Sequence, residues 1–176
     1  MVVLVSQNVK LKDSKQSVLQ VFNIMLLKII IFLVINFAAL GLGSYFTSAA
    51  VTAEWYQNLN KAPWTPPGWV FGAAWTSIMI CFTVFMVYAW QLTENRNLLI
   101  ALFVIQWILN VSWNPVFFKY HQVLFGLLII VLLMVLMGYF FFAYLPHLKA
   151  KTLLVLPYFI WLLVATTLNA YILIKN

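Results

Sequence analysis

The sequence predicts an all-α integral membrane protein, in which five transmembrane helices form a bundle and a long Trp/Pro-rich loop joins the first helix to the second. The 176-residue chain is 65% hydrophobic and only 7% charged, whereas about a quarter of the residues of a soluble domain are charged. It contains five apolar runs of the length that crosses a hydrocarbon core, about 20 residues each. All three acidic residues lie outside these runs, in tails or loops: Asp13, Glu54 and Glu94.

The first 23 residues form a mixed polar tail, and residues 24–176 form a single transmembrane domain. The first predicted span covers about residues 25–46, and the uncharged run Ile29–Phe46 within it is long enough to cross the membrane with little tilt. A cleaved signal peptide is the alternative, with Ser48-Ala49-Ala50 as its cleavage site. Signal peptides use only about 7–15 apolar residues, so the length of the run favours a membrane span.

The remaining four predicted spans cover about residues 67–91, 98–118, 122–145 and 152–174. Prolines lie near several of their ends, at Pro66, Pro67, Pro115 and Pro146. A proline is tolerated in the first turn of a helix, because the N–H that it lacks would have no partner there. The polar connections after the second, third and fourth spans are short, so these consecutive helices are expected to pack as antiparallel neighbours.

Five spans place the two termini on opposite sides of the membrane, and the basic residues divide unequally between these sides. One side has Lys10, Lys12, Lys15, Lys28, Arg96, Lys149 and Lys151, and the other has Lys61, Lys119 and Lys175. In a bacterial inner membrane the positive-inside rule predicts a cytoplasmic N-terminus, with the first loop and the C-terminus on the opposite side. The net charge of +7 is therefore assigned to membrane orientation, and we expect no nucleic-acid partner.

The stretch from Trp55 to Trp75 contains four tryptophans and three prolines. Trp and Tyr collect at membrane interfaces, so one interpretation is that these rings only anchor the chain in the headgroup region. An aromatic belt needs no rigid backbone, however, and proline fixes φ and restricts the residue before it. The second interpretation is a rigid lid or rim that includes Trp55, Pro63, Trp64 and Pro67.

Three predicted spans carry polar or aromatic residues deep in apolar sequence. In the third span Trp107, Asn110 and Asn114 share one helix face, and in the fifth Tyr158, Trp161, Ala165 and Asn169 form a similar stripe. Asparagine in lipid is costly unless it is hydrogen-bonded, so these faces are expected to point inward. They either hold the helices together or, with Trp75 of the second span, line a pocket for a flat apolar ligand with a few polar groups.

Three segments resemble the translocator protein family (TspO/MBR, the peripheral-type benzodiazepine receptor), whose bacterial members are called tryptophan-rich sensory proteins. They are "WYQNLNKAPWTPPGWVFGAAW", "NVSWNPVFF" and "LPYFIWLLVATTLNAYILIK", and the resemblance extends over about residues 32–175. It implies a five-helix membrane fold whose long first loop covers a cavity. It also implies binding of porphyrins such as protoporphyrin IX, haem-like tetrapyrroles, benzodiazepine-type and isoquinoline carboxamide drugs and, in some members, sterols.

The resemblance also implies which residues bind the ligand. The family's pocket corresponds to Trp75, Asn110, Trp161 and Ala165, to which the helical stripes add Trp107 and Tyr158 as predicted ligand contacts. Near the C-terminus Leu168, Tyr171 and Lys175 fit the proposed cholesterol pattern, which is weak because a Tyr and a Lys at a helix end are usually plain interface anchors. No obligatory cofactor and no metal site are expected.

A membrane receptor, sensor or carrier for porphyrins is the favoured function. Carriage driven by protons is disfavoured, because such transporters place Asp, Glu or His within the membrane. The alternative is an enzyme that degrades bound porphyrin with light or oxygen through Trp75 and Trp161, and a scaffold whose aromatic residues only pack is a third possibility. The family implies a homodimer, for which Ala39 and Gly43 offer small-residue spacing in the first span.

Overall fold

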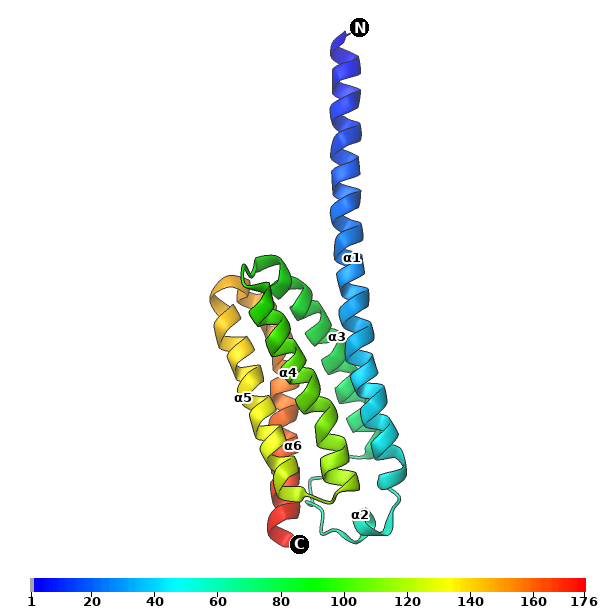
Figure 1. Cartoon of the computed structure of the whole chain (residues 1–176), viewed down its shortest axis with the longest axis vertical. Coiled ribbons are helices and arrows are strands. Elements are labelled where there is room, and N and C mark those ends of the chain that lie inside the picture. Colours follow the sequence, from blue (N-terminus) through cyan, green and yellow to red (C-terminus); the bar gives the residue numbers. More distant parts are fainter. Residues whose placement is uncertain (1) are drawn as a thin grey trace.

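The computed structural model describes the backbone of residues 2–176 and the side chains of residues 15–176, and this part of the chain is all-helical (Figure 1). The long helices are α1 (Val2–Ala50), α3 (Gly68–Leu92), α4 (Arg96–Asn114), α5 (Val123–Leu148) and α6 (Leu156–Lys175). Three short helices connect them: α2 (Glu54–Asn58), the π-helix η1 (Pro115–Lys119) and the 3-10 helix η2 (Lys149–Val155).

Four segments of the described chain are long and apolar enough to cross a membrane: Lys15–Ala50, Gly68–Leu92, Arg96–Lys119 and Val123–Lys175. The last contains both α5 and α6, because η2 joins them without a break in helical structure. The backbone reverses at Lys149, where φ is 50°, and α5 and α6 then lie side by side (Figure 1). The predicted all-helical, multi-pass membrane architecture is confirmed.

Helix α1 is longer than the predicted first span. The sequence suggested a polar tail up to residue 23 and a span over about residues 25–46, whereas one uninterrupted helix runs from Val2 to Ala50. No proline occurs in this stretch and its first glycine is Gly41, so nothing in the sequence stops the helix at residue 24. As a result α1 projects well beyond the ends of the other helices (Figure 1).

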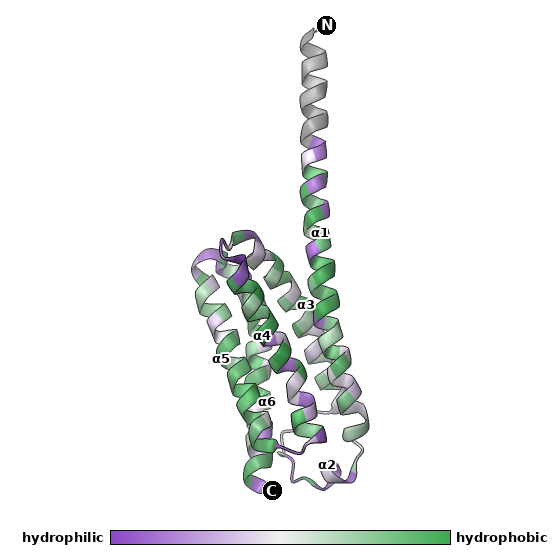
Figure 2. Ribbon diagram, viewed as in Figure 1, coloured by the Kyte–Doolittle hydropathy of each residue, from purple (hydrophilic) through white to green (hydrophobic). Residues whose placement is uncertain are grey.

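The core of the bundle is aromatic and centres on Phe82 of α3, which is fully buried. Its ring stacks on Phe103 at 6.2 Å and meets the rings of Phe140 and Tyr158 edge-on at 5.7 and 5.6 Å. Many large apolar side chains are also exposed on the outside of the helices, and most of the ribbon of the bundle has the colour of hydrophobic residues (Figure 2). Such a surface suits contact with lipid, where apolar groups gain nothing by turning inward.

Helix α1 packs on α3 and α4 through small residues and hydrogen bonds. Asn36 donates to Thr83 of α3 at 2.9 Å, and Thr47 donates to the Oδ1 atom of Asn114 at 2.9 Å. Ala39 is buried, and a Cβ atom added at Gly43 would lie 2.8 Å from the Nδ2 atom of Asn114. The spacing of Ala39 and Gly43, considered above for a dimer, therefore serves packing within the chain.

Several basic residues gather at the end of the bundle where α3 ends and α4 begins. Lys28 and Arg96 both lie over the ring of Trp90, at 6.0 and 5.6 Å from its centroid, and Lys151 lies 4.1 Å from the centre of the Tyr88 ring. Loop 51–67 and the C-terminus lie at the opposite end (Figure 1). Paired aromatic and basic side chains are typical of a membrane interface, so this end marks one surface of the bilayer.

Candidate functional site

The hydroxyl of Tyr158 is the centre of a buried polar cluster between α4 and α6. Tyr158 is fully buried, and its oxygen accepts hydrogen bonds from the Nε2 atom of Gln106 and the Nδ2 atom of Asn110, each at 2.9 Å. Gln106 precedes Asn110 by one helical turn, so both amides point from the same face of α4. Gln106 was not among the predicted site residues, although its spacing of four residues from Asn110 was a signal for it.

Aromatic rings from α3 lie against the same part of α6. Trp75 meets the ring of Tyr158 edge-on at 5.7 Å, and Phe71, one turn earlier, meets Trp161 edge-on at 5.2 Å. Ala165 follows Trp161 by one turn and is half-buried. The structure thus places Trp75, Asn110, Tyr158 and Trp161, from three helices, in one packed cluster.

The predicted ligand contact Trp107, and Asn114 from the same helical stripe, lie elsewhere. The indole N–H of Trp107 donates to the carbonyl of Ile35 at 3.0 Å, which turns this side chain toward α1. Asn114 accepts its hydrogen bond from Thr47, also on α1. Both residues therefore act as polar contacts between helices, which was the alternative interpretation of this stripe.

A second polar cluster lies closer to loop 51–67. Asn169 is 2% exposed, and neither its amide nitrogen nor its amide oxygen has a hydrogen-bond partner within the described residues. The same holds for the indole N–H of Trp113. A Cβ atom added at Gly126 would lie 3.2 Å from the Asn169 nitrogen and 3.4 Å from the Trp113 nitrogen, so the two groups are near neighbours. Buried polar atoms without partners call for an explanation, such as a bound molecule.

Trp113 was not among the predicted site residues, although it belongs to the segment "NVSWNPVFF" that carries the family resemblance. Its ring stacks on Phe117 at 5.1 Å, Phe117 meets Trp55 of the loop at 5.6 Å, and Trp55 stacks on His121 at 4.0 Å. A continuous series of rings thus connects the loop to the cluster that contains Asn169. His121 adopts a positive φ of 55° at this corner, a conformation that His visits more often than most residues do.

Loop 51–67 is fixed to the end of the bundle at a second place, on α6. Trp64 meets Tyr171 edge-on at 5.3 Å and donates from its indole N–H to Thr167 at 3.3 Å. The Asn60 backbone N–H donates to the Asn176 side chain at 2.9 Å, and the Asn60 side chain donates to the Lys175 carbonyl at 3.2 Å. Loop 51–67 therefore covers the ends of α4 and α6 and is held by contacts with both.

The other predicted residues of the loop and of the sterol motif differ in their exposure and packing. Pro63 is exposed, and Pro67 caps the start of α3 with an extended backbone. Leu168 is buried, and Tyr171 packs on Trp64 rather than lying free for a sterol. Burial raises the pKa of the Tyr56 hydroxyl, and the Lys61 ammonium group lies 4.7 Å from the centre of the same ring.

Substitution of Trp64 by alanine is expected to loosen the loop. The variant loses the ring contact with Tyr171, and such aromatic pairs contribute about 0.5–1.5 kcal/mol. Amide hydrogen exchange of residues 51–67, followed by mass spectrometry, should become severalfold faster. Trp69→Ala is the matched control, because Trp69 is 74% exposed on the surface of α3. Unchanged exchange in Trp64→Ala would contradict the anchoring role.

The side chains of these clusters are aromatic, apolar or uncharged polar groups. Among the described residues no group of three or more His, Cys, Asp or Glu side chains could hold a metal ion. The interior offers flat aromatic faces, amide donors and acceptors, and an indole N–H. Such a mixture of apolar walls and a few placed polar groups is typical of sites for small hydrophobic molecules.

Comparison with known proteins gives a consistent result. A model described as the TspO/MBR family matches residues 29–174. The chain is 35% identical over 135 residues to the Tryptophan-rich protein TspO of Archaeoglobus fulgidus, covering 76% of this chain and 87% of that protein. It is 34% identical to the Tryptophan-rich sensory protein of Cereibacter sphaeroides, covering 66% and 73% of the two chains. It is 30% identical to the human Translocator protein, covering 73% and 80%.

Proposed function

This chain belongs to the TspO/MBR family, and from this premise we propose that it is a receptor, sensor or carrier for flat hydrophobic ligands. Protoporphyrin IX and haem-like tetrapyrroles are the first candidates, followed by benzodiazepine-type drugs and sterols. The ligand binds inside a bundle of five transmembrane helices formed by α1, α3, α4, α5 and α6. The end that carries Lys28, Arg96, Lys149 and Lys151 faces the cytoplasm in a bacterial inner membrane, in keeping with the positive-inside rule.

The observation that carries this proposal is the convergence of Trp75 of α3 and Asn110 of α4 on Tyr158 of α6, with Trp161 one turn further along α6. Packing alone would not require two amides, a phenol and two indoles in one buried place, since apolar side chains fill a membrane core at lower cost. A porphyrin presents broad π faces to the indoles, and its ring nitrogens are partners for amides. The unpaired atoms of Asn169 and Trp113 offer further polar contacts on the side of the loop.

Ligand entry requires the site to open, because its side chains are packed against one another. Tyr158 is fully buried, and Trp161 and Asn110 are 8% and 7% exposed. Loop 51–67 covers the end of the bundle nearest to the second polar cluster, so we place the entrance there. Lys61 lies on this loop, half-buried, where its ammonium group can meet the propionates of a porphyrin at the wet end of the site.

The proposal predicts saturable binding of protoporphyrin IX by the purified protein, followed through the Soret band in the dark. In Trp161→Phe and in Asn110→Ala we expect the Kd to rise about tenfold, which corresponds to about 1.4 kcal/mol. The matched control is Trp69→Phe, which alters an exposed tryptophan of α3 and should leave the Kd unchanged. Circular dichroism of each variant shows whether the bundle has remained folded.

The possible outcomes separate the candidate functions. Saturable binding that all variants retain equally would place the ligand outside this cluster, and the absence of saturable binding would contradict the proposal. Illumination of the complex tests the enzyme alternative. A new porphyrin product that forms only when Trp75 and Trp161 are intact would favour degradation, whereas a complex that is stable under light supports a receptor or carrier.

A further inference from the structure

Lys28 of α1 and Arg96 of α4 lie over the same aromatic ring, at the end of the bundle opposite to loop 51–67. The charged groups are 6.0 and 5.6 Å from the centre of the Trp90 indole on α3. Glu54 and Glu94 are the only acidic side chains among residues 15–176, and neither forms an ion pair with these cations. Like charges that are held close together repel each other, so an anion in contact with both would stabilise the pair.

The two cations lie on a packed aromatic support. Trp90 meets Phe32 of α1 edge-on at 6.1 Å, and Phe32 meets Phe103 of α4 edge-on at 5.2 Å. Phe32 and Phe103 are buried, whereas Trp90 and Lys28 are half-buried and Arg96 is exposed. Neither cationic side chain donates a hydrogen bond to another described residue. Their N–H donors therefore remain for a ligand, and the support holds both of them at one place.

Each cation is followed by an exposed isoleucine one helical turn deeper in the membrane. Ile31 is the third residue after Lys28 and is 47% exposed. Ile100 is the fourth residue after Arg96 and is 44% exposed. Residues at these spacings lie on the same side of a helix, and α1 and α4 both run from this end toward the loop (Figure 1). Charge at the membrane surface with apolar side chains below it matches the structure of a phospholipid.

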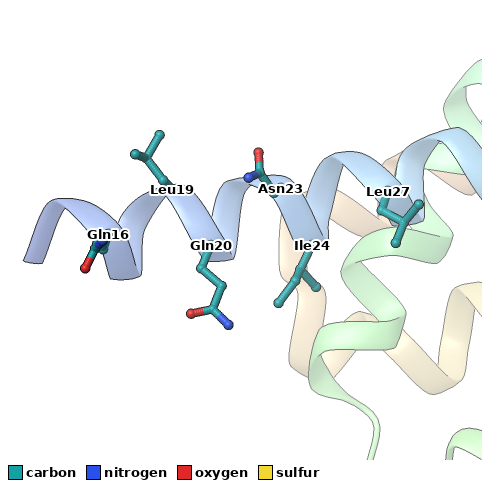
Figure 3. A pocket seen from close by; sticks show the side chains of 6 residues that line it. All are labelled: Gln16, Leu19, Gln20, Asn23, Ile24 and Leu27. Atoms are coloured by element: carbon teal, nitrogen blue, oxygen red, sulfur yellow. The ribbon is translucent and has the colours of Figure 1, made fainter. Parts of the chain in front are cut away.

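Helix α1 also bounds this site on one side, because it continues past the end of the bundle (Figure 1). Residues 16–27 of this continuation contain no charged side chain, and the six that Figure 3 labels are amides or aliphatic groups. Positive charge on this part of α1 is thus concentrated at Lys28, where the helix meets the bundle. A headgroup bound there lies in the angle between α1 and the ends of α3 and α4.

We propose that Lys28, Trp90 and Arg96 bind the headgroup of an anionic phospholipid, whose phosphate contacts both cations. One acyl chain lies along α1 and α4 over Ile31 and Ile100. Lysine and arginine are the usual partners of phosphate, and basic pockets between transmembrane helices bind anionic lipid headgroups. The site lies at the end opposite to loop 51–67, so it goes beyond the proposed ligand binding and does not depend on it.

A diffuse attraction of the whole basic end to anionic membranes is the competing explanation. Lys149 and Lys151 are exposed at the same end, and Lys151 lies 4.1 Å from the centre of the Tyr88 ring. Tyr88 and Trp90 are two residues apart on α3, so they lie on different sides of that helix. Diffuse attraction would depend equally on both pairs of cations. A bound headgroup depends on the pair at Trp90.

Native mass spectrometry of the full-length protein in a neutral detergent tests the site. Short-chain phosphatidylglycerol is the anionic probe, and phosphatidylcholine of the same chain length is its zwitterionic counterpart. We expect the wild type to bind phosphatidylglycerol about tenfold more tightly. Lys28→Gln/Arg96→Gln should lose most of this preference. Lys149→Gln/Lys151→Gln is the matched control, because it removes the same charge at the same end of the bundle, and it should keep the preference.

The outcomes separate the site from its alternatives. Equal loss of the preference in the two double variants would overturn the proposal in favour of diffuse attraction, and so would a wild type without any preference. Glycerol 1-phosphate and inorganic phosphate identify the source of the bound group. Neither should displace phosphatidylglycerol when added in excess over the lipid. Displacement by either would show a site for free phosphate, and the assignment to a lipid would be wrong. Circular dichroism of both double variants checks that the bundle is folded.

Discussion

Replacement of Tyr158 by phenylalanine is expected to lower the free energy of unfolding of the bundle by about 1–3 kcal/mol, the cost of leaving a buried hydrogen-bonding group without its partner. The hydroxyl is the acceptor for both Gln106 and Asn110. The ring contacts of residue 158 with Trp75 and Phe82 are kept in the variant, so the change isolates the hydrogen bonds. Equilibrium unfolding of the protein in mixed micelles, followed by circular dichroism, measures the effect.

Tyr139→Phe is the matched control, because Tyr139 is 47% exposed on α5 and its hydroxyl is not needed for helix packing. An equal loss of stability in both variants would contradict the central role of the Tyr158 hydroxyl. Addition of Gln106→Leu to Tyr158→Phe should recover part of the loss. The double variant leaves only the Asn110 amide without its acceptor, whereas Tyr158→Phe alone leaves two amides unpaired, and removal of both partners of a buried hydrogen bond is often nearly neutral.

Gly43→Val is expected to disturb the packing of α1 against α4. A Cβ atom at this position would lie 2.8 Å from the Nδ2 atom of Asn114, so the Asn114 side chain must shift. Overpacking of this kind costs about 1–3 kcal/mol, and here it also disrupts the hydrogen bond from Thr47 to Asn114. The same micelle unfolding experiment measures the loss.

Gly72→Val provides the control for Gly43→Val. No atom lies within 4 Å of a Cβ atom added at Gly72 on α3, so this variant should unfold close to the wild type. Combination of Gly43→Val with Asn114→Ala should lower the free energy of unfolding by less than the sum of the two single changes. The Asn114 carboxamide that clashes with residue 43 is absent from the double variant. Strict additivity would show that the close approach of Gly43 and Asn114 is energetically unimportant.

The helical membrane architecture and the family were predictable from the sequence, because long apolar runs and the Trp/Pro-rich segment are local features. The grouping of Trp75, Asn110, Tyr158 and Trp161 also followed from helical spacing and from the resemblance. Trp107 shows the limit of such reasoning. It shares a face with Asn110, but a helix face in a bundle can contact two neighbours, and only the crossing of α1 and α4 directs its indole to Ile35.

Other features depended on contacts between distant segments. The binding of the loop to α6 joins Asn60 to Asn176 and Trp64 to Tyr171, and no periodicity in the sequence links these residues. The extension of α1 beyond the predicted first span was not predicted for a different reason. Its first part is a mixed polar segment with several lysines, and polarity marks the edge of a membrane but does not end a helix.

The closed packing around Tyr158 also has a consequence for measured affinities. If only the opened bundle binds ligand, the apparent Kd equals the intrinsic Kd divided by the small fraction of molecules that are open. A change that weakens the contacts of loop 51–67 with α6 but does not alter the ligand contacts, such as Trp64→Ala, would then raise the open fraction and lower the apparent Kd. Occupancy would report the equilibrium between closed and open molecules as much as the chemistry of the ligand.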